Sequence, residues 1–121
     1  DYGALNAFVL VDSNNQPRFP ARDGTEGIPA SLTANEVKTI IRNALTIAFR
    51  ARGQIRRPLG SHAQVTVSIV DTNGAILGVA RTPDGPVFGT DVSLQKARTA
   101  TFFSNTNAAA DLIRGNSGNY W

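Results

Sequence analysis

The sequence offers few side chains that could do chemistry, and its single histidine is the first of them. His62 lies in the segment GSHAQ, just before a predicted strand, and the chain has no cysteine. A Ser-His-Asp enzyme would depend on His62 alone, and a metal site with two histidines from one chain is excluded. His62 is either the axial ligand of a haem iron or a surface or capping histidine, and we favour the second interpretation.

Two cations near the start of a predicted helix form the second candidate group. Lys96 and Arg98 are two positions apart in the segment DVSLQKARTATFF, so they point to different sides of a helix. Positive charge near a helix start opposes the helix dipole, and its placement there therefore indicates an anionic partner. That partner is either a local aspartate, Asp84 or Asp91, or the carboxylate of a ligand.

Three aspartates, Asp71, Asp84 and Asp91, surround a predicted hairpin and the helix that follows it. Paired carboxylates can act as general acid and base, but turns and helix N-caps favour aspartate for structural reasons alone. No nucleophile has a base beside it, and Gly85 and Gly89 do not have the spacing of a phosphate-binding loop. An enzyme acting on a small molecule is therefore the least supported interpretation.

The net charge and the distribution of arginines indicate which partners the chain could bind. The chain of 121 residues fits one domain and carries 12 Lys and Arg against 9 Asp and Glu, a net charge of +3. Four arginines lie in the segment RARGQIRR, residues 50–57, but no aromatic residue among them could stack on a base. We therefore expect a solvated helix end and do not expect nucleic acid as a partner. No apolar run approaches the length of a membrane span.

Two predicted elements come before the hairpin. The segment FVLVDSNNQPRF predicts a strand over residues 8–11 and a turn over residues 12–15, because Asp and Asn favour turn conformations. The segment TANEVKTIIRNALTIAFRARG predicts a helix that begins with a capping box of Thr33 and Glu36 and ends at Gly53. Its apolar residues recur at helical spacing, so we expect one face to pack on a flat surface.

A hairpin and two further helices are predicted in the second half of the chain. Asn73-Gly74 between two β-rich runs predicts a type I′ turn, which needs positive φ at both residues. Thr90 or Asp91 is expected to cap the next helix, and a short helix is expected over residues 108–114. The runs FVLVDSNNQPRF and VSIVDTNGAILG share a Val-Asp and an Asn, which indicates either a duplication or two hairpins built with the same chemistry.

From residue 32 to residue 104 the sequence resembles the GlcG/HbpS-like haem-binding family, which is related to the C-terminal domain of the adenosyltransferase PduO. The family pattern is a strand ending in Val-Val-Asp, a glycine turn, a return strand ending near Arg, an Asp-Gly or Asp-Ala pair and a helix with Lys-Ala-x-Thr-Ala. The corresponding residues here are Val70, Asp71, Gly74, Arg81, Asp84, Gly85 and the run Lys96-Ala97-Arg98-Thr99-Ala100. The segment LTANEVKTIIRNALTIAF matches the first helix of the family.

The resemblance implies an α/β (α+β) fold in which an antiparallel sheet is flanked by helices. It also implies that the domain binds haem or a related tetrapyrrole and that it assembles as an oligomer. On this basis Lys96, Arg98 and Thr99 are the candidates to contact the propionates or the iron. His62 is a candidate axial ligand from its residue type alone.

The chain departs from the family pattern at both ends. An extension over residues 1–30, a strand or hairpin and a loop, precedes the family-like domain of residues 31–121, and the later glycine-rich strand and closing helix of the family do not follow. The sheet would keep an exposed edge, which isolated proteins avoid. We therefore expect that the remainder of a longer or nicked chain, or a neighbouring copy, completes the sheet. The comparable exported bacterial proteins suggest a periplasmic or secreted location.

Two functions of different class follow from these observations. The first is a binding module that holds haem or another anionic planar ligand. The second is a structural or oligomerisation domain without catalytic activity, kept as a scaffold inside a larger protein.

Overall fold

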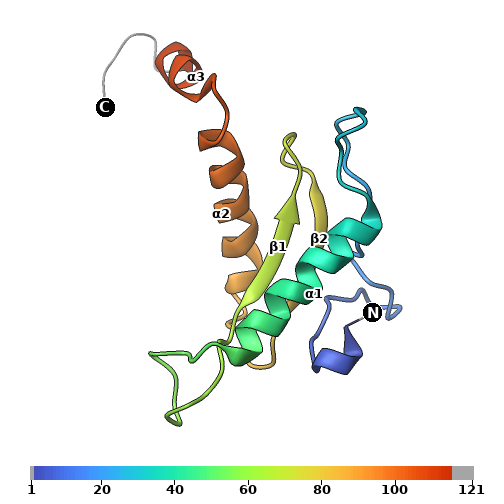
Figure 1. Ribbon diagram of the computed structural model, residues 1–121, viewed down its shortest axis with the longest axis vertical. Helices are drawn as coiled ribbons and strands as arrows, with labels where there is room; N and C mark the ends of the chain where they lie inside the picture. The colour runs from blue at the N-terminus through green and yellow to red at the C-terminus, as the bar shows by residue number, and fades with distance from the viewer. Residues whose placement is uncertain (1, 116–121) are drawn as a thin grey trace.

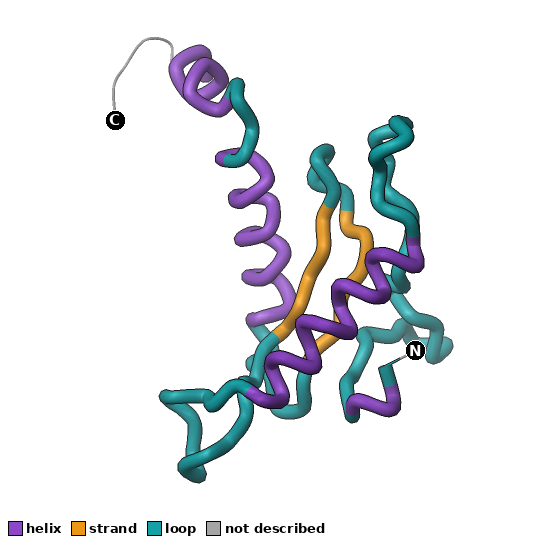
Figure 2. The backbone as a smooth tube through the Cα atoms, viewed as in Figure 1, coloured by secondary structure: helices purple, strands orange, loops and turns teal. Residues whose placement is uncertain are grey.

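The computed structural model describes residues 2–115 and has a two-stranded antiparallel sheet and three α-helices (Figure 1, Figure 2). The predicted class, an antiparallel sheet flanked by helices, is confirmed as an α+β arrangement. The elements are η1 (Gly3–Leu5), α1 (Ala34–Arg50), β1 (Thr66–Val70), β2 (Ile76–Arg81), α2 (Gly89–Phe103) and α3 (Ala108–Gly115). In Figure 1, α1 lies across the hairpin, α2 runs beside β1, and α3 extends away from both. No helix in the described part of the chain is both long and apolar enough to cross a membrane.

The predicted capping box begins α1. Oε2 of Glu36 accepts hydrogen bonds from the N–H and the hydroxyl of Thr33, both at 2.8 Å, and the Glu36 N–H donates to the Thr33 hydroxyl at 3.3 Å. These bonds satisfy N–H groups that have no partner inside the helix. The buried face of α1 consists of Val37, Ile41, Leu45 and Ala48.

The end of α1 is decided by the chain that returns from the following loop. Ala51 is extended, with φ −79° and ψ 132°, so the helix ends at Arg50 and the prediction of Gly53 is wrong. The Ala63 N–H donates to the carbonyl oxygens of Ala48 and Ala51, at 3.2 and 2.9 Å. In a helix that continued, these carbonyl oxygens would accept hydrogen bonds from the N–H groups of the next turn.

The hairpin turn differs from the predicted type I′. Gly74 has a positive φ of 74°, whereas Asn73 does not lie in the left-handed region. The Asp71 N–H donates to the Ala75 carbonyl at 3.1 Å, and the Gly74 N–H donates to the Asp71 carbonyl at 3.0 Å. The loop therefore has three residues, 72–74, and the left-handed glycine ends it, which is a common way to close a hairpin of this length.

The two related runs of the sequence fold into the same kind of turn. Oδ1 of Asp12 accepts the N–H groups two and four residues further on at 2.8 and 2.9 Å, and Oδ1 of Asp71 does so at 3.0 and 2.8 Å. Asn15 and Gly74, at the same place in each turn, have φ of 62° and 74°. The predicted turn over residues 12–15 is confirmed, and the two runs share the turn chemistry of aspartate.

The segment before α1 covers the outer edge of β2. Backbone hydrogen bonds of 2.9 to 3.3 Å join Phe8 to Arg81, Phe19 to Val79, and Arg22 to Leu77. The predicted strand over residues 8–11 is wrong, because this segment makes only isolated bridges. Pro17 and Pro20 have no N–H to donate, which limits a continuous ladder with the hairpin.

The core lies between α1 and the hairpin, and it requires a glycine. The buried cluster consists of Tyr2, Val37, Ile41, Leu45, Leu77 and Ala80. A Cβ atom at Gly78 would lie 2.8 Å from Cδ1 of Ile41 and 3.2 Å from Cγ1 of Val37. The helix therefore approaches β2 as closely as a residue without a side chain permits.

The start of α2 lies earlier than the sequence predicts. The helix begins at Gly89 without a side-chain cap, so the prediction of Thr90 or Asp91 as the cap is wrong. The Gly89 N–H donates to the Pro86 carbonyl at 2.9 Å, and the Thr90 N–H donates to the Val87 carbonyl at 3.2 Å. These N–H groups already have backbone partners, so the preceding turn winds directly into the helix.

The two later helices differ in how they contact the sheet. The hydroxyls of Ser68 and Ser93 are hydrogen-bonded at 2.6 Å, which joins β1 to α2. The predicted short helix is confirmed as α3, and among its described residues only Ala108 is buried.

The outer edge of β1 has no backbone partner within residues 2–115. The Thr82 N–H donates to the Val65 carbonyl at 3.0 Å. The alternation of an antiparallel ladder then turns the N–H and C=O groups of Thr66 and Ser68 away from β2. No backbone hydrogen bond of the described chain reaches these groups, so the backbone of one edge of the hairpin is paired and that of the other edge is not.

Replacing Gly78 by Ala is expected to lower the free energy of unfolding by about 1–3 kcal/mol, as overpacking a close-packed core usually does. The added methyl would press on Ile41 and Val37 of α1. The control is Gly3→Ala, because a Cβ atom at Gly3 meets no atom within 4 Å. Urea denaturation measures the difference, and equal stability of the two variants would show that the packing of α1 does not depend on Gly78.

Candidate functional site

A buried carboxylate, Asp71, holds the hairpin turn against the N-terminal loop. The residue is 4% exposed. Oδ2 accepts hydrogen bonds from the N–H and the hydroxyl of Thr25, at 2.8 and 2.6 Å. Oδ1 accepts the N–H groups of Asn73 and Ala75, at 3.0 and 2.8 Å. Neutral donors therefore stabilise this negative charge.

The hydrogen bonds of this region decide the protonation of two carboxylates. Burial alone would raise the pKa of Asp71, but the hydrogen bonds from Thr25 and from two N–H groups of the turn outweigh it and hold the pKa below its usual value. Glu26 accepts the N–H and the hydroxyl of Thr72, both at 3.1 Å, and the backbone hydrogen bond lowers the pKa of Glu26. Both groups are ionised at neutral pH, and neither is tuned to exchange a proton.

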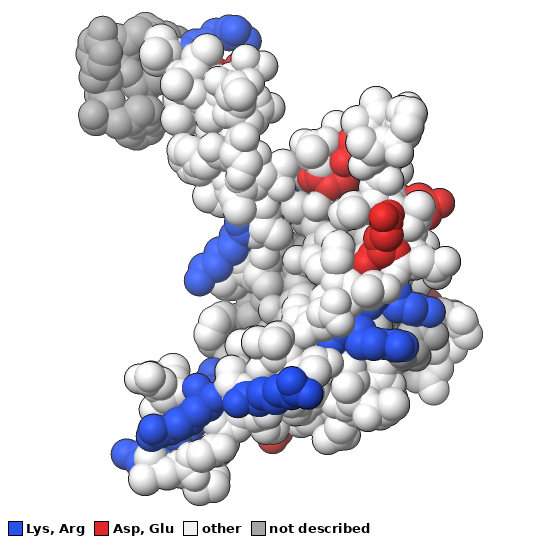
Figure 3. Space-filling view, viewed as in Figure 1, with Lys and Arg blue, Asp and Glu red and all other residues white. Residues whose placement is uncertain are grey.

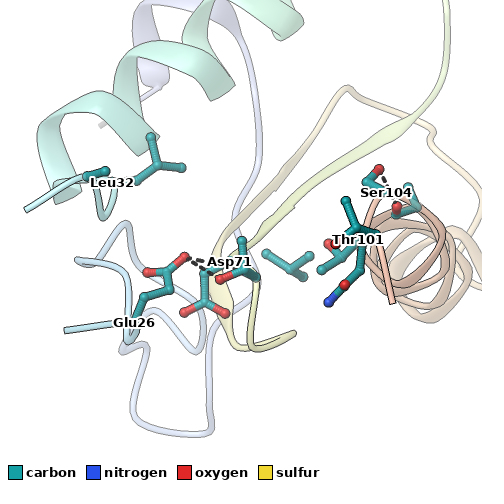
Figure 4. Close-up of a pocket in the computed structure, with 11 residues that line it drawn as sticks. Glu26, Leu32, Asp71, Thr101 and Ser104 are labelled. Carbon is teal, nitrogen blue, oxygen red and sulfur yellow. Dashed lines mark hydrogen bonds between the residues drawn. The ribbon is translucent and has the colours of Figure 1, made fainter. Parts of the chain in front are cut away.

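An open groove of about 700 Å³ lies between this turn and the C-terminal half of α2. Figure 4 shows Glu26 and Leu32 on one side, Thr101 and Ser104 on the other, and Asp71 between them. The lining contains two carboxylates and no Lys or Arg. The Ser104 hydroxyl donates to a carbonyl of its own helix at 2.7 Å. A groove with this charge disfavours an anion, and its carboxylates already serve the turn.

Three arginines line a second cavity, of about 470 Å³, which we call the arginine pocket. Its lining consists of Arg18, Phe19, Pro20, Arg22, Ala75, Ile76 and Arg98. Nε of Arg22 donates to the Ile76 carbonyl at 2.6 Å, and Nε of Arg98 donates to the Gly74 carbonyl at 3.0 Å. The guanidinium carbon of Arg18 lies 5.8 Å from the centre of the Phe19 ring, within reach of a cation–π interaction.

The arginine pocket has no acidic counterpart in the described structure. No carboxylate of residues 2–115 forms an ion pair with its three arginines, and the ion pair that is present there joins Arg114 to Asp111 on α3. Asp84 and Asp91 are therefore not the partners of Arg98, which binds the Gly74 carbonyl instead. Neighbouring cations repel one another, and an anion bound between them would relieve this repulsion.

The remaining predicted contacts on α2 lie outside this pocket. Lys96 is exposed. Thr99 is exposed as well, and its hydroxyl donates to the Gln95 carbonyl at 2.9 Å, inside its own helix. Of the predicted site residues, the structure places Arg98 alone in the arginine pocket.

His62 lies at the opposite end of β1, beside the C-terminus of α1. Its ring packs against Phe49, with centroids 5.0 Å apart and planes at 42°. Nε2 is buried and has no hydrogen-bond partner within the described residues. A metal ion would have to open this packing to reach Nε2, so iron ligation by His62 stays a prediction. Residues 2–115 hold no group of three His, Cys, Asp or Glu placed to bind a metal ion.

Sequence reasoning missed Arg18 and Arg22. Arg22 contacts the Ile76 carbonyl, which is 54 residues further along the chain. The available signal was the segment RFPAR, in which two arginines flank an aromatic residue. This segment contributes to a site only when it lies along the edge of β2, and residue spacing could not predict that placement.

Comparison of the chain with models of protein families, with curated proteins and with solved structures gives no match. The family resemblance therefore rests on the sequence motifs. Several of these motif residues have structural roles: Asp71 holds the turn, and the Arg81 guanidinium donates to the Gly85 carbonyl.

The substitution Asp71→Asn is expected to lower the free energy of unfolding at neutral pH by about 1–3 kcal/mol, because an amide cannot accept hydrogen bonds at both positions and leaves a buried donor unpaired. The matched control is Asp84→Asn. It removes the same charge from an exposed residue with φ of 56°, a conformation that asparagine adopts readily. Urea denaturation of both variants checks this expectation.

The free energy of unfolding of wild type and of Asp71→Asn is expected to depend differently on pH. The pKa of Asp71 is lower in the folded state than in the unfolded chain, so its contribution is complete above the unfolded pKa of about 3.9. The contribution is lost as the pH falls through the lower, folded value. The stability difference between wild type and Asp71→Asn should therefore shrink in acid, and a constant difference down to the acid transition would contradict a role for the charge.

Proposed function

We propose that the chain is a binding module for an organic anion, which it holds in the arginine pocket. One observation carries the proposal: Arg18, Arg22 and Arg98 line the same cavity and have no ion pair with a carboxylate of the described chain. These three arginines face a shared space.

The chemistry of the pocket suits a carboxylate attached to an apolar or flat body. A guanidinium group is planar and can bind a carboxylate through two parallel hydrogen bonds. In Arg22 and Arg98 the Nε–H is occupied by a carbonyl oxygen, which fixes the side chain and leaves the two terminal amino groups for the anion. Phe19 and Ile76 supply apolar surface for the rest of the ligand.

The family resemblance suggests that this anion is haem or a related tetrapyrrole. We propose that the propionates of such a ligand bind the three arginines and that its ring contacts Phe19 and Ile76. The lining contains no His, Cys, Met or Tyr, which are the usual protein ligands of haem iron. The residues present thus fit the carboxylates and not the iron, so we propose that binding acts through the carboxylates.

A titration with two ligands tests this proposal. Haemin and metal-free protoporphyrin are expected to bind with the same stoichiometry, followed by absorption at the Soret band. Arg22→Gln and Arg98→Gln are each expected to weaken binding by about tenfold or more, because a hydrogen bond to a charged group is worth roughly 1.5–3 kcal/mol. His62→Ala should leave both affinities unchanged.

The control for this titration is Arg114→Gln, which removes one positive charge on α3, away from the pocket. Absence of saturable binding of both ligands would refute the proposal. Binding of haemin alone, abolished by His62→Ala, would instead place the ligand at His62.

The second candidate function is assembly through the sheet, and the outer edge of β1, whose backbone groups have no partner within residues 2–115, favours it. Thr66 and Ser68 direct unpaired backbone groups outward, and such an edge readily accepts another strand. Large apolar side chains are exposed at the end of α2, Phe102 and Phe103, and on α3, Leu112 and Ile113. We propose that a neighbouring copy adds a strand to this edge.

A proline placed on this edge tests the assembly. Ser68→Pro removes an N–H that points away from β2, and proline is tolerated at such edge positions. Ser68→Ala is the control, because it removes only the hydroxyl that bonds to Ser93. By light scattering, wild type and Ser68→Ala are expected to form the same oligomer and Ser68→Pro a monomer. A monomeric wild type would contradict the proposal.

A further inference from the structure

The loop between α1 and β1 projects from the end of the molecule opposite the hairpin turn (Figure 1). We call residues 51–63 the arginine-rich loop. Its base is closed by a bridge between Arg52 and His62 and by a hydrogen bond of 2.8 Å from the Gly53 N–H to the Ser61 carbonyl. These contacts hold the base, so the tip of the loop is presented to the outside.

Two aliphatic side chains at the tip face solvent. Ile55 is 87% exposed and Leu59 is 68% exposed. Four arginines accompany them, of which Arg50, Arg52 and Arg57 are exposed and Arg56 is half-buried. Aliphatic side chains that stand out among cations on one surface are the composition of a segment that lies at a membrane interface.

The charge of the chain is unevenly distributed around this loop. Residues 37–70 contain six of the 12 Lys and Arg and none of the nine Asp and Glu. Figure 3 shows basic side chains gathered toward the lower end of this face and acidic side chains at its upper right. No carboxylate within this stretch of the sequence competes for the loop arginines.

The expectation of a solvated helix end accounts for only part of this cluster. Arg50 lies in the last turn of α1, where a cation complements the helix dipole. Arg56 and Arg57 lie beyond the helix, and the effect of the dipole falls off within the last turn. The helix dipole therefore does not account for Arg56 and Arg57. Ile55 and Leu59 do not pack in the core, because both side chains are exposed.

We propose that the arginine-rich loop docks on the surface of an anionic phospholipid bilayer. Ile55 and Leu59 enter the boundary between headgroups and acyl chains, and the arginines bind the phosphates around them. The proposal is independent of the arginine pocket, which lies beside the hairpin turn and contains none of the loop residues.

A lipid surface fits these observations better than a nucleic acid does. Phosphates of either partner would attract the arginines. A nucleic acid, however, is expected to meet aromatic side chains that stack on its bases, and the loop has none. The nearest aromatic residue in the sequence, Phe49, is packed against His62. Ile55 and Leu59 would leave water on a lipid surface, whereas a nucleic acid backbone offers them no apolar contact.

Flotation with vesicles tests the proposal on the complete chain. Wild type is expected to float with vesicles of phosphatidylcholine that contain phosphatidylglycerol, and to remain in solution with phosphatidylcholine alone. Arg56→Gln with Arg57→Gln should weaken partitioning by roughly 30-fold, about fivefold for each arginine near an anionic surface. Ile55→Ser with Leu59→Ser should weaken it by roughly 100-fold or more, because two aliphatic side chains no longer leave water.

Two matched variants control for charge and apolar surface. Lys96→Gln with Arg114→Gln removes two cations outside the loop, and Val87→Ser with Ile28→Ser removes two exposed aliphatic side chains elsewhere. Both should float like wild type, and thermal unfolding confirms that every variant is folded. Failure of wild type to bind the anionic vesicles, or full binding by the Ile55 and Leu59 variant, would overturn the proposal. Binding of a short DNA duplex without binding of vesicles would identify nucleic acid as the partner instead.

Discussion

The negative charge of Asp71 is stabilised inside the protein by four hydrogen bonds, and the organisation of the hairpin end depends on them. Two of the bonds come from Thr25 and two from N–H groups of the turn. Because the donors belong to segments far apart in the sequence, the same carboxylate shapes the turn and holds the N-terminal loop against it. That loop carries Arg22 to the return strand, and the arginine pocket forms where it meets Arg98 of α2.

The arginines of the pocket and of the arginine-rich loop have no carboxylate partner among residues 2–115. Asp71 and Glu26 are held by N–H and hydroxyl groups, and neither forms an ion pair within residues 2–115. Positive charge therefore remains available at two separate places, the arginine pocket beside the turn and the arginine-rich loop at the other end of β1. Both places combine arginines with apolar surface, a combination that suits an amphipathic anion more than a simple inorganic one.

The hairpin has two edges with different roles. The edge of β2 is occupied by the N-terminal segment, which protects it and supplies half of the arginine pocket. The edge of β1 offers backbone groups at Thr66 and Ser68 without a partner in the described chain. α1 covers one face of the hairpin at the close distance that Gly78 allows, and α2 runs beside β1 (Figure 1).

The sequence by itself determined the features that depend on neighbouring residues: the capping box of α1, the aspartate turns, the hairpin and α3. At the end of α1 it was wrong because a distant segment supplies the partner: the returning chain takes the carbonyl groups. It was also wrong about the turn type at Asn73-Gly74 and about the cap of α2, although both are local. Of the pocket, only Arg98 was predicted, and the reason was wrong: α2 begins at Gly89, so Arg98 lies beyond the first turn, where the helix dipole no longer acts on it. Arg18 and Arg22 became site residues only in the tertiary structure, since the backbone of β2 and its turn, not residue spacing, decides where their segment lies.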